Sequence, residues 1–236
     1  MTSANLAIGS VVLDYDLVLE RRKTIAITVY PDQTVRVKAP IQATRKHIDE
    51  MLTRRAHWIL KQKRYFAQYK PRKPKQYVSG ETFRYLGRSY KLLVRRAIDE
   101  ERVVLHKGEI VVYTSMFGNW LNTKRLLYCW FAERASIIFP EILAECLGSF
   151  DLDQAPVLAI RSMRRRWGSY SSQTHRITLN LDLIRATKQQ IRYVLIHELC
   201  HTHSYRHDAK FYLRLNEILP GWKTTKEQLE KALLGQ

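Results

Sequence analysis

Two histidines and a glutamate in the C-terminal third of the chain have the spacing of a metal-dependent hydrolase site. His197 and His201 are four residues apart, and Glu198 directly follows the first of them. On an α-helix this spacing separates two side chains by about 40°, so both imidazoles can occupy corners of one metal tetrahedron. Glu198 is placed to accept a proton from a metal-activated water. The pattern predicts a hydrolase with Zn²⁺ as its cofactor.

The residues before this HExxH motif favour a helix with one buried face. Between residues 188 and 196, apolar side chains such as Ile191, Val194 and Leu195 recur at helical spacing. The alternative is that the two histidines are ordinary hydrogen-bonded side chains beside an unrelated glutamate. The helical setting favours the metal site.

A third metal ligand must come from the histidines that follow, His203 or His207. In an unbroken helix His207 would lie about 240° around the axis from His201, so the helix must end between them. Asp208 is a good N-cap for a second helix, which Pro220 and Gly221 would end. A turn before Asp208 can bring His207 back to the metal, so His207 is the expected third ligand.

Three neutral imidazoles would leave one position on the zinc ion open to water and substrate. Glu198 would serve as general base and then return the proton to a leaving amine, which predicts peptide-bond hydrolysis. A nucleotide phosphohydrolase is an alternative, although the sequence has neither an acidic Mg²⁺ cluster nor a glycine-rich phosphate loop.

The stretch upstream of the motif has features of a substrate-binding sheet edge. Residues 157–163 and 176–181 favour strands, and the Gly, Ser, Gln and Thr residues between them favour a hairpin. Zinc proteases commonly add an extended substrate to such an edge. Alternatively, Trp167 simply packs over the helix and Gly168 makes a tight turn. The candidate substrate contacts are Arg166, Trp167, Gly168, Ser169 and Tyr205. The candidate oxyanion donors are Arg166, Tyr205 and Tyr212.

The chain also resembles a known family, the YgjP-like metallopeptidases, which are relatives of the SprT-like and other zincin proteases. Residues 161–169 (RSMRRRWGS) are similar to that family's RxMxxRWGS signature, and residues 177–180 (ITLN) to the strand after it. The resemblance extends over roughly residues 15–230. It implies a metallopeptidase whose metal ligands are His197, His201 and His207, with Glu198 as the catalytic carboxylate. Tyr170 departs from the pattern, because many relatives carry Cys there.

The charge of the chain is strongly positive: 40 Lys and Arg residues against 22 Asp and Glu give a formal net charge of +18. Such a surface attracts polyanions, and basic clusters interleaved with aromatic residues predict a nucleic-acid partner. A nucleic-acid-associated protein with conditional protease activity is therefore a second alternative, as is a preference for acidic substrates. The clusters lie at residues 21–23, 54–55, 61–64, 70–75 and 164–166, and the aromatic residues are Tyr65, Phe66, Tyr69 and Tyr77.

Cysteine usage and hydropathy point to a cytoplasmic protein. The three cysteines are isolated, which favours reduced thiols. No apolar run approaches the roughly 18 residues that cross a bilayer, and residues 1–17 lack a signal-peptide pattern. We therefore expect no membrane partner.

The elements that must position the site predict an α+β fold. Strands are expected within residues 15–38, one long helix over 44–69, a short β-meander over 83–113, and a helix over 119–147 interrupted or kinked at Pro140. We expect an N-terminal β-rich portion with the long helix (1–115) and a C-terminal zincin-like unit (116–236), or both as one compact domain. The helix over 119–147 should pack behind the HExxH helix. The sequence shows no internal repeat.

Overall fold

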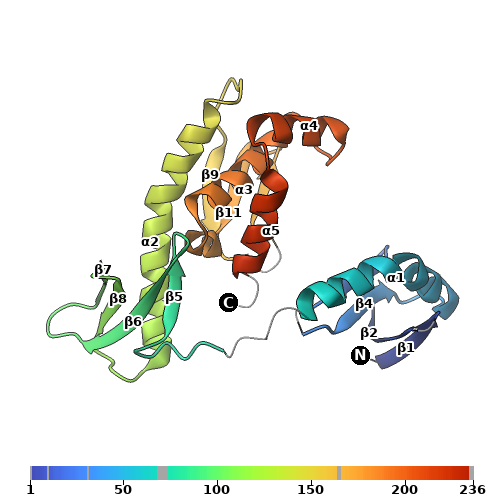
Figure 1. Cartoon of the computed structure of the whole chain (residues 1–236), viewed down its shortest axis with the longest axis horizontal. Helices are drawn as coiled ribbons and strands as arrows, with labels where there is room; N and C mark the ends of the chain where they lie inside the picture. The colour runs from blue at the N-terminus through green and yellow to red at the C-terminus, as the bar shows by residue number, and fades with distance from the viewer. Residues whose placement is uncertain (1, 10, 31, 68–73, 164–165, 234–236) are drawn as a thin grey trace. The chain divides into compact units, whose positions relative to one another are not determined.

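The computed structural model describes residues 2–9, 11–30, 32–67, 74–163 and 166–233 (Figure 1). Within these ranges the fold is α+β, as the sequence predicts, with five α-helices, one short 3-10 helix and three small sheets. The expected basic clusters at 70–75 and 164–166 and the side chains of Tyr65, Phe66 and Tyr69 lie wholly or partly outside the described residues.

The chain divides into two compact units, one formed mainly by Met1–Pro74 and the other by Lys75–Leu233. This division falls earlier than the boundary expected near residue 116. The reason is that the strands within 82–114 pair with one another and pack on the helix that follows them. The expectation of two portions or of one compact domain stays a prediction.

The N-terminal unit is a four-stranded sheet covered by one helix. Its sheet has the order β1-β2-β4-β3, with β2 and β4 parallel and the outer pairs antiparallel. The helix α1 (Arg45–Ala67) matches the expected long helix, and its buried side chains pack on those of the sheet. The first strand was not predicted, because its TSANLAI sequence has few large apolar residues. The strands are β1 (Thr2–Ile8), β2 (Val11–Glu20), β3 (Ala26–Val29) and β4 (Val35–Pro40).

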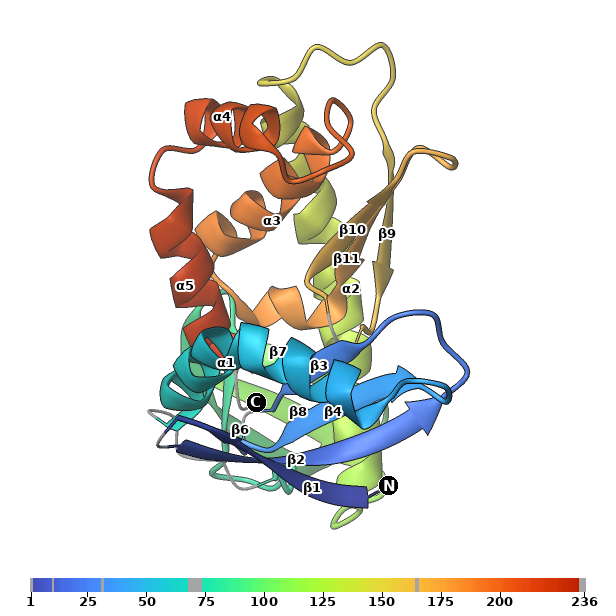
Figure 2. The ribbon, with the colours of Figure 1, turned by 90° about the vertical axis from the view of Figure 1, so that its right-hand side faces the viewer.

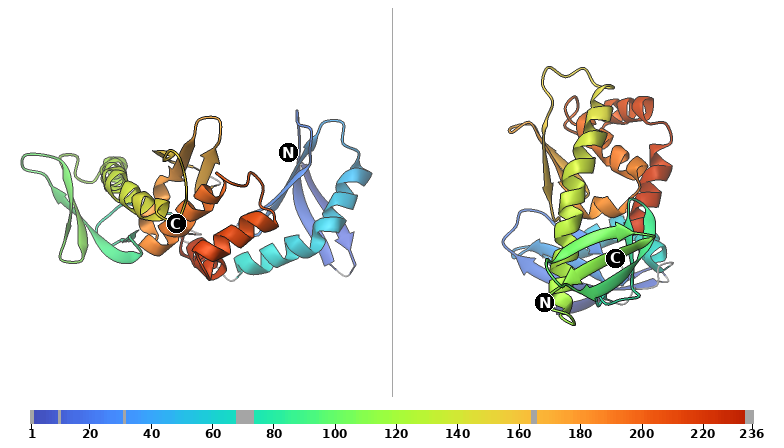
Figure 3. Two further views of the ribbon diagram at one scale, coloured as in Figure 1. Left: turned by 90° about the horizontal axis from the view of Figure 1, so that it is seen from above. Right: turned by 90° about the vertical axis from the view of Figure 1, so that its left-hand side faces the viewer.

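The second unit begins with another four-stranded sheet, beside the N-terminal end of helix α2 (Trp120–Leu147) (Figure 3). Its order is β5-β6-β8-β7, and β6 and β8 are parallel. The expected β-meander is therefore wrong in its strand order. Alternation of apolar residues shows which face of a strand is buried but not which strand is its neighbour. The strands are β5 (Thr82–Tyr85), β6 (Arg88–Arg96), β7 (Arg102–His106) and β8 (Glu109–Thr114).

The two four-stranded sheets share one topology. In each, two antiparallel hairpins are joined by parallel pairing of the second and fourth strands, and a long helix follows. The sequence shows no repeat at these positions, so the similarity is one of chain path. In the second unit the helix also packs on the helix that carries the histidine motif.

Helix α2 supports the rest of the second unit. Asn119 caps it by accepting the backbone N–H of Leu121 (3.1 Å) and Asn122 (3.3 Å). The helix continues through Pro140 to its end, so the expected interruption is not observed. None of the helices in the described part of the chain is both long and apolar enough to span a membrane.

The remaining elements surround one central helix, α3 (Lys188–Cys200). The helix lies between a three-stranded sheet and helix α5 (Trp222–Leu233), and it packs on α2 as expected (Figure 2). The sheet has the order β10-β11-β9, so β10 is an edge strand. The other elements are β9 (Val157–Arg161), β10 (Gly168–Ser171), β11 (Arg176–Asn180), the 3-10 helix η1 (Leu181–Arg185) and α4 (Ala209–Ile218).

Candidate metal centre

The start of α3 is fixed by a capping box. Thr187 Oγ1 accepts the backbone N–H of Gln190 (3.2 Å), and Gln190 Oε1 accepts the backbone N–H of Thr187 (3.0 Å). These two bonds satisfy N–H groups that would otherwise lack partners at the helix start. The face beyond them buries Ile191 and Leu195 completely. The helix is thereby held in one rotational setting, with His197 in its last turn and His201 at its C-cap.

A turn after α3 brings a third histidine to the first two. Asp208 caps α4 by accepting the backbone N–H of Phe211 (2.9 Å), as the sequence predicts. The ring centroid of His207 lies 4.9 Å from that of His197 and 4.7 Å from that of His201. His203 lies elsewhere, with Nδ1 2.7 Å from Thr202 Oγ1.

The three rings present nitrogen atoms that could hold one metal ion. One ring nitrogen from each of His197, His201 and His207 lies within 4.8 Å of the others. The Nε2 atoms of His197 and His207 are 3.0 Å apart, close to the roughly 3.3 Å expected for two nitrogens on one tetrahedral zinc ion. Nδ1 of His201 is 3.0 Å from the carbonyl oxygen of Ser204. With its proton on Nδ1, that ring would donate to the carbonyl and leave Nε2 free for a metal.

Burial lowers the pKa of two of the imidazoles. It lowers the pKa of His197 to about 3, with smaller contributions from the neighbouring His201 and His207. Burial also lowers the pKa of His207. Phe211 packs against all three rings, at 4.6 to 5.0 Å between centroids. Neutral imidazoles are the form that binds metals, so the residues present fit a divalent ion with nitrogen ligands.

Glu198 is buried beside this cluster. Burial raises the pKa of its carboxyl to about 7, although the backbone N–H of Tyr170 and the charge of Arg166 both act in the opposite direction. A carboxyl that titrates near neutrality is suited to take up and release a proton.

The metal-free protein should lose stability in acid through His197. Its pKa falls from 6.5 in the unfolded chain to about 3 in the folded protein. The contribution of the neutral ring to the free energy of unfolding is therefore complete above pH 6.5 and is lost as the pH falls toward 3. Glu198 has the opposite effect, because its pKa rises from 4.5 in the unfolded chain to about 7 in the folded protein. Glu198 therefore adds to the free energy of unfolding as the pH falls from 7, and this gain is complete by pH 4.5. Melting temperatures of the metal-free protein should therefore fall most steeply below pH 4.5. In the His197→Gln variant the melting temperature should fall less steeply with pH. A fall as steep as in the wild type would contradict the role given to His197.

Strand β10 approaches α3 at Glu198 because residue 168 is a glycine. The backbone oxygen of Trp167 accepts the N–H of Asn180 (2.8 Å), so by alternation the main-chain groups of Gly168 and Tyr170 point away from β11. A Cβ atom at Gly168 would lie 2.7 Å from Oε1 of Glu198 and 2.9 Å from Cγ1 of Val194. The close contact between the strand and the carboxylate therefore needs glycine at this position.

Replacing Gly168 with alanine should displace β10 from α3. The added methyl group meets a buried helix, so we expect a loss of about 1–3 kcal/mol in unfolding free energy. Because even a small displacement of the predicted catalytic carboxylate would be costly, kcat/KM should fall about 10- to 100-fold. Gly148→Ala is a matched control, since a Cβ there comes no closer than 3.9 Å to Glu145 O. If Gly168→Ala kept the melting temperature and turnover of the wild type, the close contact between β10 and Glu198 would be unnecessary for stability and activity.

The remaining predicted substrate contacts differ in their exposure and in what they pack against. Arg166 is exposed and close enough to Glu198 to affect its pKa. Trp167 is half-buried and packs against the core, as the packing alternative predicts. Ser169 is half-buried in β10, and Tyr205 is 86% exposed in the turn before α4. Substrate contact by these residues stays a prediction.

An aromatic stack beside the histidines was missed at the sequence level. The Trp222 ring lies between Tyr193 (6.3 Å between centroids, 4° between planes) and Tyr212 (5.5 Å, 12°). Tyr212 in turn stacks on His207 (6.2 Å, 26°). One signal was available, because Tyr193 precedes His197 by one helical turn. The position of Trp222 depends on tertiary packing and has no local signature.

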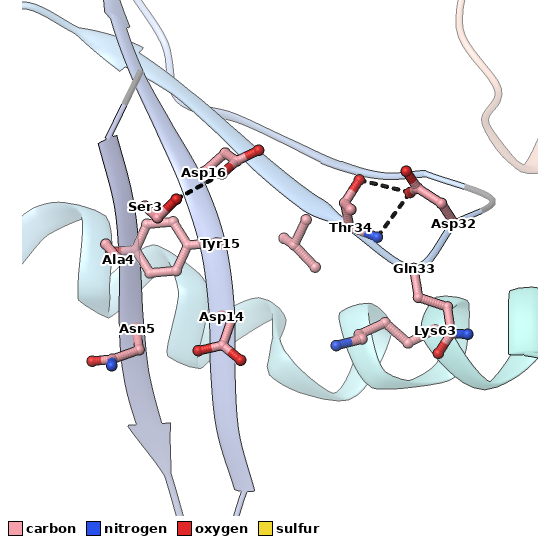
Figure 4. Close-up of a pocket in the computed structure, with 11 residues that line it drawn as sticks. Ser3, Ala4, Asn5, Asp14, Tyr15, Asp16, Asp32, Gln33, Thr34 and Lys63 are labelled. Carbon is pink, nitrogen blue, oxygen red and sulfur yellow. Dashed lines mark hydrogen bonds between the residues drawn. The ribbon is translucent and has the colours of Figure 1, made fainter.

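A separate hollow of about 590 Å³ in the N-terminal unit does not form a comparable site (Figure 4). It contains the carboxylates of Asp14, Asp16 and Asp32. Two of these are engaged internally: Asp16 accepts the Ser3 hydroxyl (3.3 Å), and Asp32 accepts the N–H (3.0 Å) and hydroxyl (2.7 Å) of Thr34. Among the described residues, the histidine cluster is the group of three close potential ligands that could hold a metal.

Comparison with known proteins identifies one family. The model of the YgjP-like metallopeptidase domain matches residues 23–232. Two solved structures are similar to part of the chain: the metallopeptidase zymogens of Pyrococcus abyssi abylysin and Methanocaldococcus jannaschii jannalysin. Their identities are 20% and 22%; they cover 40% of this chain and 94% and 96% of their own, each with a TM-score of 0.38. At these scores the structural likeness adds nothing to the family match. No curated protein matches the chain.

Proposed function

This chain belongs to the YgjP-like metallopeptidase family, and we propose that it is a zinc-dependent peptidase of the zincin type. The family makes it a peptidase that depends on a metal. The proposal adds the identity of the metal and the residues that hold it and do the chemistry. One observation carries it: three imidazoles, two of them with a lowered pKa, converge beside a buried carboxyl.

In the proposed mechanism His197, His201 and His207 would hold a zinc ion, which would supply Lewis-acid chemistry to a water molecule and to the scissile carbonyl. Glu198 accepts the proton of the attacking water on a carboxylate oxygen and then delivers it to the leaving amide nitrogen. The N–H of Tyr170 orients that carboxylate. A pKa near 7 lets one group perform both transfers at neutral pH.

The free edge of β10 is the proposed binding site for the substrate backbone. This strand lies at the edge of its sheet, directly beside Glu198. An extended peptide added there would form main-chain hydrogen bonds and bring its amide to the carboxylate. Arg166 and Ser169 would contact the substrate along this edge, and the exposed Tyr205 would reach it from the turn before α4.

The proposal is tested by cleavage of an unstructured protein substrate. Zinc-loaded protein should cleave it, a chelator should stop cleavage, and added Zn²⁺ should restore it. Phosphate release from nucleoside triphosphates is measured on the same preparation. Chelator-resistant cleavage would contradict the metal mechanism. Phosphate release without peptide cleavage would favour the phosphohydrolase alternative.

Nucleic-acid association is a second proposal, favoured by the outer face of α1. Arg54, Trp58 and Lys61 are exposed at three- to four-residue spacing, so cations flank an accessible indole on one side of the helix. Such an arrangement suits phosphate contacts with stacking on an unpaired base. Binding of a labelled single-stranded oligonucleotide should weaken steeply as salt is raised from about 50 to 200 mM. Absence of binding at the lower salt would rule the proposal out.

We also propose that the protein is located in the cytoplasm. The three cysteines form no disulfide: Cys146 and Cys200 are buried, and Cys129 is exposed. Free thiols, one of them exposed, are typical of a reducing compartment.

A further inference from the structure

A groove between α4 and α5 adjoins the histidine cluster. It is a solvent-open hollow of about 640 Å³. Its floor is tied to the cluster by the aromatic stack, because Tyr212 contacts both His207 and Trp222. The groove is therefore held in a fixed position beside the proposed metal. Its lining residues are Ala209, Tyr212, Leu213, Asn216, Trp222 and Lys223.

The lining offers apolar surface that the fold leaves uncovered. The Tyr212 side chain is 42% exposed and that of Leu213 is 63% exposed, whereas Trp222 is buried beneath them. Large apolar surfaces grouped in a concave site are typical of ligand-binding positions. A bulky apolar side chain placed there would cover them.

Charge at the groove adds a second element of selectivity. None of its lining residues is acidic. Lys223 stands at the rim, with Nζ 5.8 Å from the centroid of the Trp222 ring. A basic side chain entering the groove would meet this cation without a carboxylate to pair with, and like charges so placed repel.

We propose that this groove receives the side chain of the substrate residue next to the scissile bond, and that it selects a bulky apolar or aromatic residue over a small or basic one. The inference rests on the proposed peptidase function. A peptide on the β10 edge would place its scissile amide at Glu198 and the histidines, and Tyr212, which lines the groove, stacks on His207. Because the groove has aromatic and aliphatic walls, its selectivity should follow apolar size.

Leu213 allows the subsite to be tested without disturbing the histidines. It lies on α4 two residues after Phe211, which is fully buried against the three rings. Two residues turn the helix by about 200°, so Leu213 faces away from that contact. Leu213→Ala should therefore alter the groove and leave the cluster intact. Leu121→Ala is a matched control, since Leu121 is 58% exposed on α2 and does not line the groove.

The experiment uses zinc-loaded protein and a set of quenched peptides with Phe, Leu, Gly or Lys on either side of the cleaved bond. Wild type should prefer Phe or Leu over Gly and Lys at one position by about tenfold or more in kcat/KM. Leu213→Ala should reduce this preference several-fold through KM, and Lys223→Glu should relieve the penalty against Lys. Leu121→Ala should behave as wild type. Affinities of the same peptides for the Glu198→Gln variant should show the same order.

The outcomes separate the subsite from the peptidase function. Cleavage with no size preference, or with a preference that Leu213→Ala and Lys223→Glu leave unchanged, would overturn the subsite alone. Failure of the zinc-loaded protein to cleave any peptide, together with absent binding to Glu198→Gln, would overturn the peptidase proposal and the subsite with it.

Discussion

Replacing Glu198 with glutamine should abolish peptide hydrolysis while the fold and metal binding remain. Glutamine has nearly the same shape and can still accept the N–H of Tyr170, but its amide cannot take up a proton. Because burial already disfavours the ionised carboxylate and raises its pKa to about 7, removing the charge should not destabilise the protein. Loss of general acid–base catalysis corresponds to about 10²- to 10⁴-fold in kcat/KM.

The measurement compares kcat/KM, zinc content and melting temperature for wild type and Glu198→Gln. Glu141→Gln is the matched control, because Glu141 is exposed on α2, away from the histidine cluster. It should retain wild-type turnover. Substantial turnover by a zinc-loaded Glu198→Gln variant would rule out the proton-transfer role.

Replacing His207 with alanine should remove the metal and the activity together. The proposed site has three protein ligands, so losing one leaves two imidazoles in a cluster otherwise lined by Phe211. Changes to partners outside the ligand shell typically cost 10- to 100-fold in metal affinity, and loss of a ligand should cost about 100-fold or more. Hydrolysis should fall with the bound metal.

His203→Ala is the control for this prediction. His203 follows the motif as closely as a candidate ligand would, but its ring contacts Thr202 and Phe150 and lies outside the cluster. Zinc titration with a chromophoric competitor should show wild-type affinity for His203→Ala. Equal weakening in both variants, or weakening in His203→Ala alone, would contradict the choice of His207.

The histidine cluster could be predicted because its determinants are local. The four-residue spacing of His197 and His201 sets their common helix face, and Asp208 marks the start of the next helix. A break between these two positions is enough to bring His207 back. The resemblance at residues 161–169 indicated the family, and the match of the family model over residues 23–232 confirms it.

The contacts that complete the site are not local and could not be predicted in this way. Gly168 meets Glu198 across 30 positions of sequence, through the packing of a sheet edge on a helix. The stack of Tyr193, Trp222 and Tyr212 joins three different helices. The parallel pairing of β6 with β8 was missed for the same reason. Periodicity specifies which face is buried and leaves the partner open.

X-ray absorption at the zinc edge of the zinc-loaded protein tests the proposed metal site itself. It should show three imidazole nitrogens at about 2.0–2.1 Å and one further light ligand at a similar distance. Sulfur at about 2.3 Å, which would point to Cys200, or a shell with fewer than three imidazoles would contradict the proposed site.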